Sequence, residues 1–312
     1  MNILITGAAG YIGQCLEKII RNKNVILLDK NKINYRTNKK FLKINLLNKK
    51  KLNTLFKKEK IDTIIHLAGE SLVDEKKSYS LYYKNNIQVL KNILCVMKKN
   101  KTQNLIFSST ASVYKFNCKP VTEKSKLDPK SKYARTKLEC EKLIKKSSIR
   151  YIILRFFNVA SSLPTQLRGE SHSPETHLIP LFITKIIKGD VLNIYGNNHK
   201  TQDGTCVRDF VHIKDICNAI IKSAILIKKK KISEIINIGT NKGFSVKKIF
   251  LRMQKYAKYK VKFKIKNKRK GDTPYLVSDY KKARKILDWH PKYSNLDKII
   301  SDEFKWKKIS LN

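Results

Sequence analysis

The sequence predicts an α/β fold in which a doubly wound parallel sheet is followed by a smaller, less regular C-terminal region. Three observations support this fold class. Apolar runs of strand length alternate with segments of helical spacing along the first half of the 312 residues. The first apolar run leads into a glycine-rich turn, and Pro and Gly recur in longer loops beyond about residue 158. Alternating strands and helices form right-handed βαβ units, which build a parallel sheet.

The elements follow one another in the order that this fold requires. Helical spacing predicts a first helix through Leu16, Ile19 and Ile20, and later helices over 79–98 and 131–146. We place a first domain at residues 1–158, completed by segments near 204–227, and a second at 159–312. The apolar runs predict strands over 2–6, 25–28, 61–67, 105–107 and 151–156.

The charge of the chain is unusual, because 68 Lys and Arg face 24 Asp and Glu, giving +44. One interpretation is an anionic partner, such as nucleic acid, an anionic membrane or a phosphorylated substrate. The other is compositional drift, since the excess is mostly Lys, spread along the whole chain among many Asn and Ile. We favour drift, because the basic runs 228–231 and 266–270 lack the interleaved aromatics of nucleic-acid sites.

Several classes of protein do not fit the sequence. No apolar run approaches the ~18 residues of a membrane helix, and no basic leader precedes the first strand, so we expect neither membrane insertion nor a signal peptide. The six cysteines form no Cys-x-x-Cys pair, which favours a reduced, cytoplasmic setting. His172 and His177 have no paired ligands near them in the sequence, so we expect no metal site.

The glycine turn predicts a dinucleotide site of the Rossmann type. Gly7, Gly10 and Gly13 lie between a strand and a helix, where they allow a tight turn, approach to a pyrophosphate and close helix packing. Asp29 ends the second strand. An acid there hydrogen-bonds ribose hydroxyls and repels a 2′-phosphate, which predicts NAD rather than NADP. The alternative for Asp29 is an ordinary turn residue.

A second constellation suggests proton transfer. Tyr133 and Lys137 are four residues apart on a predicted helix and therefore share a face. An ammonium near a phenol stabilises the phenolate and lowers a pKa that starts near 10. Such a phenolate can take a proton from a sugar hydroxyl, and Thr110 adds a hydroxyl at a strand end. Tyr and Lys four apart also occur on many helices without any such role.

These residues come with further motifs in a recognisable order: His66-Leu67-Ala68-Gly69, Tyr82-Tyr83-Lys84-Asn85-Asn86, 108–114 (SSTASVY), 203–212 (DGTCVRDFVH), 269–274 (RKGDTP) and 288–291 (DWHP). Together they resemble the UDP-glucose 4-epimerases of the extended short-chain dehydrogenase/reductases over nearly the whole chain. The resemblance implies an isomerase of galactose metabolism that interconverts UDP-glucose and UDP-galactose. It would oxidise sugar C4 transiently with NAD and re-reduce it without stereospecificity. It also implies a cytoplasmic homodimer paired through helices 79–98 and 131–146.

The resemblance further implies individual roles. Tyr133 would be the acid/base, Lys137 its partner and a nicotinamide-ribose contact, and Thr110 the group that orients the sugar. Two arginines suit a diphosphate, because guanidinium groups chelate phosphate oxygens. The implied cofactor contacts beyond the three glycines and this triad are Tyr11, Ile12, Asp29, Asn45, Leu46, Leu67, Ala68, Gly69, Asn85 and Phe157. The implied substrate contacts are Asn158, His177, Leu178, Tyr195, Arg208, Arg269, Asp272 and Leu276.

Departures from the family pattern leave alternatives open. Leu276 stands where a bulky Tyr restricts such enzymes to plain hexoses, so we expect UDP-N-acetylhexosamines to be accepted too. The alternative is that Leu276 only packs against the neighbouring core and that, with the register shifted by one, Tyr275 is the gate. Other departures are Lys30, Asn45, Ser71, Lys115 and His177. The rival functions are another nucleotide-sugar epimerase or dehydratase of this fold, or a degenerate basic nucleic-acid-binding module. Ala111-Ser112 lacks the Asp-Glu pair of the dehydratases.

Overall fold

The computed structural model describes residues 1–72, 74, 76–171, 175–257, 259–269 and 271–311. The chain forms two compact units. Unit 1 comprises 1–113, 127–155 and 217–236, and unit 2 comprises 114–126, 156–216 and 237–312. The first unit therefore receives a returning segment from beyond residue 158, which begins at 217. Residues 114–126 belong to unit 2, although the sequence predicts them to lie in the first domain.

Unit 1 is built on a seven-stranded sheet in the order β10-β6-β5-β4-β1-β2-β3. Strands β1 to β5 pair in parallel along this order. The doubly wound parallel sheet is thus confirmed. The strands are β1 (Ile3–Thr6), β2 (Val25–Asp29), β3 (Lys40–Lys43), β4 (Thr63–His66), β5 (Asn104–Thr110), β6 (Arg150–Phe156) and β10 (Glu234–Ile238).

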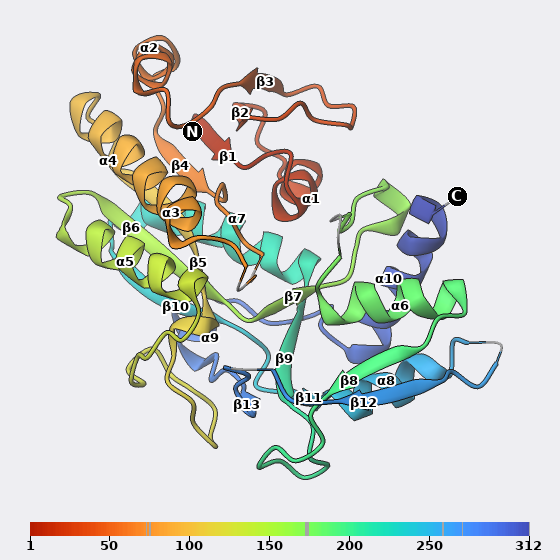
Figure 1. Ribbon diagram of the computed structural model, residues 1–312. Coiled ribbons are helices and arrows are strands. Elements are labelled where there is room, and N and C mark those ends of the chain that lie inside the picture. The colour runs from red at the N-terminus through yellow and green to blue at the C-terminus, as the bar shows by residue number, and fades with distance from the viewer. Residues whose placement is uncertain (73, 75, 172–174, 258, 270, 312) are drawn as a thin grey trace. The chain divides into compact units, whose positions relative to one another are not determined.

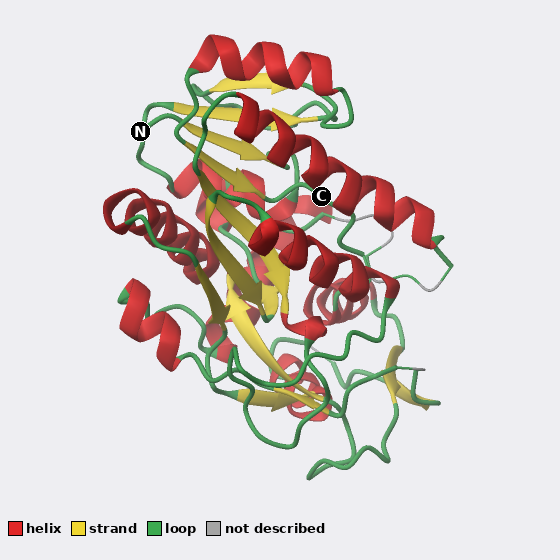
Figure 2. Cartoon of the chain, turned by 90° about the vertical axis from the view of Figure 1, so that its left-hand side faces the viewer, coloured by secondary structure: helices red, strands yellow, loops and turns green. Residues whose placement is uncertain are grey.

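Helices cover both faces of this sheet, which explains why its central strands are continuously apolar (Figures 1 and 2). One hydrophobic core joins Leu4 and Ile64 of the sheet to α2, α4 and α5. The helical segments are α1 (Tyr11–Ile19), α2 (Lys49–Glu59), α3 (Tyr79–Tyr82), the π-helical η1 (Tyr83–Gln88), α4 (Val89–Lys99), the short η2 (Ala111–Val113), α5 (Lys132–Lys146) and α7 (Ile213–Lys230). None of the described helices is long and apolar enough to cross a membrane.

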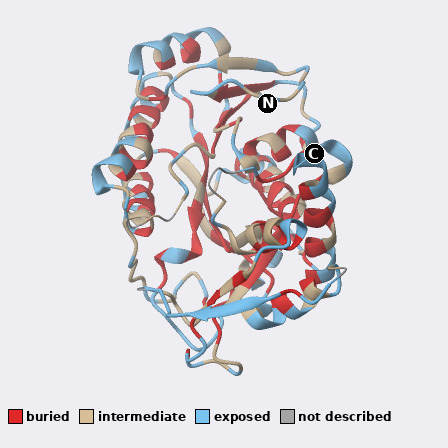
Figure 3. Ribbon diagram, turned by 45° about the vertical axis from the view of Figure 1, so that its right-hand side comes forward, coloured by how far each residue is buried: buried red, intermediate tan, exposed pale blue. Residues whose placement is uncertain are grey.

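Unit 2 is built from smaller sheets. Strand β9 (Val207–His212) pairs with β7 (Asn158–Ala160), β11 (Gly243–Ser245) and β13 (Tyr275–Leu276), and β8 (Leu192–Tyr195) pairs with β12 (Phe263–Lys266). A second core joins β8 to α6 (Leu178–Lys188), α8 (Val246–Gln254) and α10 (Leu296–Leu311). Figure 3 shows buried residues along the strands and on the inner faces of these helices. The remaining elements are η3 (Pro164–Gln166) and α9 (Lys281–Leu287).

Candidate active site

The glycine turn after β1 is packed so tightly that side chains are excluded. Gly7 has φ +77°, and a Cβ there would lie 2.6 Å from the Ala68 amide nitrogen. A Cβ on Gly13 would lie 2.2 Å from the Gly7 carbonyl oxygen. Gly10 precedes α1 without a side-chain cap, and the first turn of that helix carries no acid in its described residues. The positive end of α1 therefore suits an anionic group, as a dinucleotide requires.

Asp29 lies at the end of β2, directly beside this turn. Its Oδ2 accepts a hydrogen bond from the Ala9 N–H at 3.0 Å, and its Oδ1 accepts one from the Asn31 N–H at 2.9 Å. The Tyr35 hydroxyl donates to the Ala8 carbonyl at 2.9 Å. Asp29 thus braces the glycine turn from the end of β2. These residues fit an adenine dinucleotide.

The other implied cofactor contacts in unit 1 lie at the ends of the neighbouring strands. Leu67, Ala68 and Gly69 follow β4, and Tyr11 and Ile12 open α1.

Asn45 and Leu46 follow β3, and Asn85 lies half-buried in η1. The Asn45 side-chain oxygen already accepts from the Leu47 N–H at 3.0 Å, and the Leu46 side chain is buried in the core. Phe157 belongs to unit 2, where its N–H donates to the Ile238 carbonyl. Any contribution from Leu46 must come from its backbone.

Thr110, Tyr133 and Lys137 come together in unit 1. Thr110 ends β5, and Ser131 caps α5 by accepting from the Ala134 N–H at 3.1 Å, which starts the helix just before Tyr133. The Tyr133 hydroxyl is hydrogen-bonded to Thr110. Lys137 is buried with its Nζ 4.4 Å from the centre of the Phe107 ring. The three candidate catalytic residues thus belong to one cluster.

The pKa of Tyr133 corrects one expectation. Although part of the residue reaches solvent, its phenol group is enclosed, and desolvation raises the pKa of Tyr133 to about 12. The hydrogen bond to Thr110 opposes this rise. Burial lowers the pKa of Lys137 to about 8. Lys137 therefore does not bring the pKa of the phenol below 10, because burial is the dominant influence on Tyr133 and the Lys137 ammonium faces the Phe107 ring.

Two features that hold this cluster were missed at the sequence level. Glu141 of α5 forms a buried two-point ion pair with Arg155 of β6, at 2.6 Å and 3.0 Å, and also accepts from Ser109 of β5. The ion pair holds the helix that carries Tyr133 against β6, and the Ser109 bond holds it against β5, the strand that carries Thr110. In the sequence the indication was the single arginine, Arg155, in the apolar run that predicts β6.

The second feature is Asn86, the neighbour of the predicted Asn85. Its Oδ1 accepts from the Glu70 N–H at 2.8 Å, and its Nδ2 donates to Thr136 Oγ1 at 3.0 Å. Asn86 is buried and so ties the loop after β4 to α5. In the sequence, the indication that Asn86 connects these segments was its place directly after Asn85 in the Tyr-Tyr-Lys-Asn-Asn motif.

Several implied substrate residues also come together within unit 2. The Arg269 guanidinium lies 4.5 Å from the centre of the Tyr195 ring, and its Nε lies 3.6 Å from Asp272 Oδ2. Arg208 donates to the carbonyls of Val207 and Thr273, so it holds the loop that contains Asp272. Two guanidinium groups and a carboxylate are the groups that a nucleoside diphosphate needs.

Leu276 rather than Tyr275 shares a face with Arg208. In the parallel pairing of β13 with β9, Leu276 lies opposite Arg208 and Tyr275 opposite Val207. Paired residues of neighbouring strands point to the same face, and successive residues point to opposite faces. The Tyr275 ring lies toward Gly243 of β11. The strand pairing therefore favours Leu276 over Tyr275 as the residue that would face a sugar bound beside Arg208.

The remaining implied residues occupy the edges of the same unit. Asn158 begins β7 opposite Phe210, and Leu178 begins α6 with its side chain against the core. His177 Nδ1 lies 2.5 Å from Glu170 Oε1 and 3.5 Å from Glu175 Oε1. Burial opposes its charge, but hydrogen bonds to both carboxylates outweigh burial and raise the pKa of His177 to about 10. His172 lies outside the described residues.

The comparisons with known proteins agree with this geometry. The NAD dependent epimerase/dehydratase family matches residues 3–239. The UDP-glucose 4-epimerase of Lactobacillus helveticus is 35% identical, over 99% of this chain and 97% of that protein.

Solved structures agree as well. The UDP-glucose 4-epimerase of Brucella ovis in complex with NAD is 30% identical with a TM-score of 0.90, covering 97% of both chains. That of Bifidobacterium longum, in complex with NAD⁺ and UDP, is 26% identical with a TM-score of 0.91, covering 100% of this chain and 99% of the other. The chain therefore belongs to the NAD-dependent epimerase/dehydratase family and, within it, to the UDP-glucose 4-epimerases.

Proposed function

We propose that this chain interconverts UDP-glucose and UDP-galactose, with Tyr133 as the acid/base at the sugar 4-hydroxyl. The observation that carries this assignment is the hydrogen-bonded pair of Thr110 and Tyr133, held beside Lys137 in the unit that contains the glycine turn. Ala111 and Ser112, which follow Thr110, carry no carboxyl for a dehydratase reaction. A dehydratase function of the same fold is therefore disfavoured.

The chemistry divides between the cofactor and the side chains. Bound NAD supplies a hydride acceptor and donor for the sugar C4. A general base works best with a pKa near the working pH, so proton removal by Tyr133 requires that its raised pKa falls when NAD and the sugar are bound. Thr110 orients the same hydroxyl, and the charged form of Lys137 favours the phenolate. Tyr133 would return the proton to the 4-oxygen once the keto sugar has presented its other face, which completes the inversion at C4.

Inversion requires that the hexose turns over while the nucleotide stays bound. We assign the diphosphate to Arg208 and Arg269, and the uridine ribose to Asp272. Bidentate hydrogen bonds from guanidinium groups hold a diphosphate firmly. Because these contacts act on the UDP moiety and not on the hexose, the hexose can present either face to Tyr133.

Turnover of the purified chain on UDP-galactose tests the function. We expect UDP-glucose to form without added oxidant and without net consumption of cofactor. Denaturation should release NAD rather than NADP, since Asp29 would repel a 2′-phosphate. An absence of turnover with NAD present in the protein would contradict the assigned reaction. Release of NADP would contradict the role of Asp29 alone.

We also propose a cytoplasmic homodimer. The pairing surface would be formed by α3, η1 and α4 together with α5, which pack side by side (Figure 1). This surface exposes Tyr79 and Leu81, and the Tyr79 hydroxyl donates to Glu139 at 3.2 Å. Exposed aromatic and aliphatic groups on paired helices suit a symmetric helix-bundle interface.

A further inference from the structure

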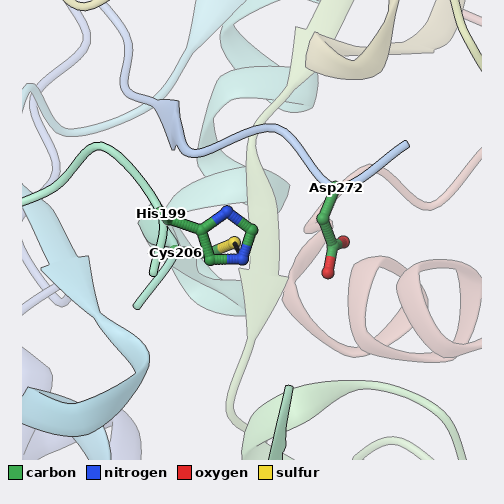
Figure 4. A group of neighbouring side chains, drawn as sticks. All are labelled: His199, Cys206 and Asp272. Carbon is green, nitrogen blue, oxygen red and sulfur yellow. Dashed lines mark hydrogen bonds between the residues drawn. The ribbon is translucent and has the colours of Figure 1, made fainter. Parts of the chain in front are cut away.

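His199, Cys206 and Asp272 form a compact cluster in unit 2, and the proposed epimerase chemistry uses only Asp272 of the three (Figure 4). One possible ligand atom of each residue lies within 4.8 Å of the others. His199 and Cys206 are buried, whereas Asp272 is half-buried and comes from a separate loop. In Figure 4 the Cys206 sulfur lies against the His199 ring, with the Asp272 carboxylate to one side.

The spacing of the two buried atoms matches a tetrahedral metal site. Cys206 Sγ lies 3.4 Å from His199 Nε2. Zinc binds sulfur at about 2.3 Å and imidazole nitrogen at about 2.0–2.1 Å, so a tetrahedral angle separates these two ligand atoms by about 3.5 Å. The pair is therefore already at the distance that a shared ion requires.

The loop that carries His199 holds the ring in place. The His199 N–H donates to the Gly204 carbonyl at 2.9 Å. A Cβ on Gly196 would lie 2.5 Å from His199 Nε2, so the ring packs directly on this glycine. Gly196 and Gly204 both have positive φ, near +78° and +76°. Because the surrounding backbone holds the His199 ring in this way, the side chain loses little conformational freedom when it binds a metal ion.

The chemistry of the three donors selects the ion. A thiolate, an imidazole and a carboxylate suit zinc, whereas calcium and magnesium require oxygen ligands. The thiolate and the carboxylate together balance the charge of a divalent ion. The fourth position of the tetrahedron would be left to water.

A second group, Glu170, Glu175 and His177, is less suited to a metal ion. Its two carboxylates hold the imidazole in its protonated form, and a protonated imidazole cannot ligate a metal. The expectation of no metal site rested on His172 and His177, and it did not consider His199 together with Cys206. These two residues are close in sequence, but the third ligand lies 66 positions beyond Cys206.

We propose that His199, Cys206 and Asp272 bind one zinc-class divalent ion, and that this ion inhibits the enzyme by occupying Asp272. Metal binding follows from the geometry alone, whereas the inhibition rests on the proposed function, in which Asp272 holds the uridine ribose. The ion would also withdraw Asp272 from Arg269, which lies 3.6 Å away. Because the coupling of two ligands is reciprocal, the nucleotide sugar should weaken metal binding by the same factor.

Titration of the full chain with Co²⁺ tests the metal site independently of activity. We expect one ion per chain, with a thiolate-to-cobalt charge-transfer band and visible bands of tetrahedral cobalt. His199→Ala and Cys206→Ser should each weaken binding at least about tenfold, and Cys206→Ser should remove the charge-transfer band. Cys118→Ser is the matched control, because Cys118 is an exposed thiol in the same unit.

The outcomes of the titration are distinct. The absence of a charge-transfer band in the folded wild-type chain would overturn the site. Loss of the band in Cys118→Ser, with its retention in Cys206→Ser, would also overturn it. Because Cys206 is buried, circular dichroism should check that its variant is folded, and His199→Gln provides a second variant at a less buried ligand.

Steady-state kinetics with added Zn²⁺ test the inhibition. We expect Zn²⁺ to raise the KM for UDP-galactose with little change in kcat, and a chelator to restore the original value. His199→Ala should keep the basal turnover and lose the sensitivity to Zn²⁺. Binding of cobalt without inhibition by zinc would overturn the link to Asp272. A chain without any epimerase activity that still binds cobalt would contradict the proposed function and leave the metal site standing.

Discussion

At Tyr133, burial raises the pKa of the phenol, whereas proton transfer at neutral pH needs a lower pKa. Desolvation raises the pKa of Tyr133 to about 12, so the free enzyme holds this phenol protonated at neutral pH. The hydroxyl of Thr110 is the nearby group that favours the phenolate. An acid/base works best with a pKa near the working pH, so the proposed role of Tyr133 requires that its pKa falls when cofactor and sugar are bound.

We predict that Tyr133→Phe retains NAD and loses about 10²- to 10⁴-fold in kcat, the usual effect of removing one acid/base group. The ring keeps its packing, so the cofactor site should not change. Turnover of UDP-galactose and the NAD content of the denatured protein are the two measurements. A variant with wild-type kcat would show that another group transfers the proton.

At Leu276, the pairing of β13 with β9 favours one of the two residues proposed to limit the sugar pocket. We expect the wild-type enzyme to accept both UDP-galactose and UDP-N-acetylgalactosamine. Leu276→Tyr should lower kcat/KM for the N-acetylated sugar relative to the plain one by about 10- to 100-fold, since a small change in a pocket is worth about 1–3 kcal/mol. Tyr275→Phe is the control, because its ring lies toward Gly243. An unchanged substrate ratio in Leu276→Tyr would exclude it as the gate.

The residues of the candidate site differ in how well they can be predicted from the sequence. Gly7, Asp29, Tyr133 and Lys137 lie in local patterns whose spacing has a physical meaning, so they could be placed before the structure. The ion pair of Glu141 with Arg155 could not, because Glu141 is one of many charged residues on its helix and only the packing of α5 on the sheet brings it to Arg155. The direction of the Tyr133 pKa was likewise wrong, since burial cannot be judged from spacing.

At the scale of elements, the junction of β1 and α1 is the most constrained part of unit 1. We predict that Gly13→Ala lowers the melting temperature and NAD content, because its Cβ would lie 2.2 Å from the Gly7 carbonyl oxygen. Overpacking of this kind costs about 1–3 kcal/mol. Gly10→Ala is the matched comparison, since its Cβ would lie 3.3 Å from the same atom and should have a smaller effect on stability. Equal melting temperatures for Gly13→Ala and the wild type would show that the turn can relax.

The elements that were predicted are those with long apolar patterns. Strands β1, β2, β4, β5 and β6 and helices α1 and α5 are confirmed, and the helix expected over 79–98 forms α3, η1 and α4. Strand β3 and helix α2 were missed. Lysines flank the two apolar residues of β3, whereas α2 buries Leu52, Leu55 and Phe56 at helical spacing among lysines. The helical spacing of the apolar residues of α2 was therefore present in the sequence, but the surrounding lysines obscured it.

For the whole molecule, the net charge of +44 bears on assembly more than on the fold. The proposed pairing surface carries exposed basic residues, among them Lys91, Arg135 and Lys142. Like charges on two facing copies repel, and salt screens that repulsion over about 10 Å at 0.1 M.

We therefore predict a dimer that weakens as salt is removed. Sedimentation at micromolar concentration should give twice the chain mass at about 0.3 M salt and a lower average mass at about 0.02 M. Lys142→Glu should reduce this dependence on salt, whereas Lys260→Glu, in an exposed loop of unit 2, should not. A chain that stays monomeric at both salt concentrations would contradict the proposed pairing.

Stability against pH should depend on Glu303, a fully buried residue of α10 whose carboxyl oxygens have no hydrogen-bond partner among the described residues. Burial raises the pKa of Glu303 from 4.5 to about 8, and the nearby carboxylates of Glu170, Glu175 and Asp302 add to the rise while Lys307 opposes it. The folded chain therefore keeps a proton that the unfolded chain loses between pH 4.5 and about 8. Stability contributed by this proton is lost as the pH rises through that window.

We expect the melting temperature of the wild type to fall between pH 5 and 8 for this reason. Glu303→Gln should flatten the decline and raise stability at pH 8 by an amount on the order of a few kcal/mol, because the amide cannot ionise. Asp190→Asn, at an exposed position of the same unit, is the control and should leave the profile unchanged. Thermal unfolding followed by circular dichroism provides the measurement. A Glu303→Gln profile parallel to that of the wild type would place the titrating group elsewhere.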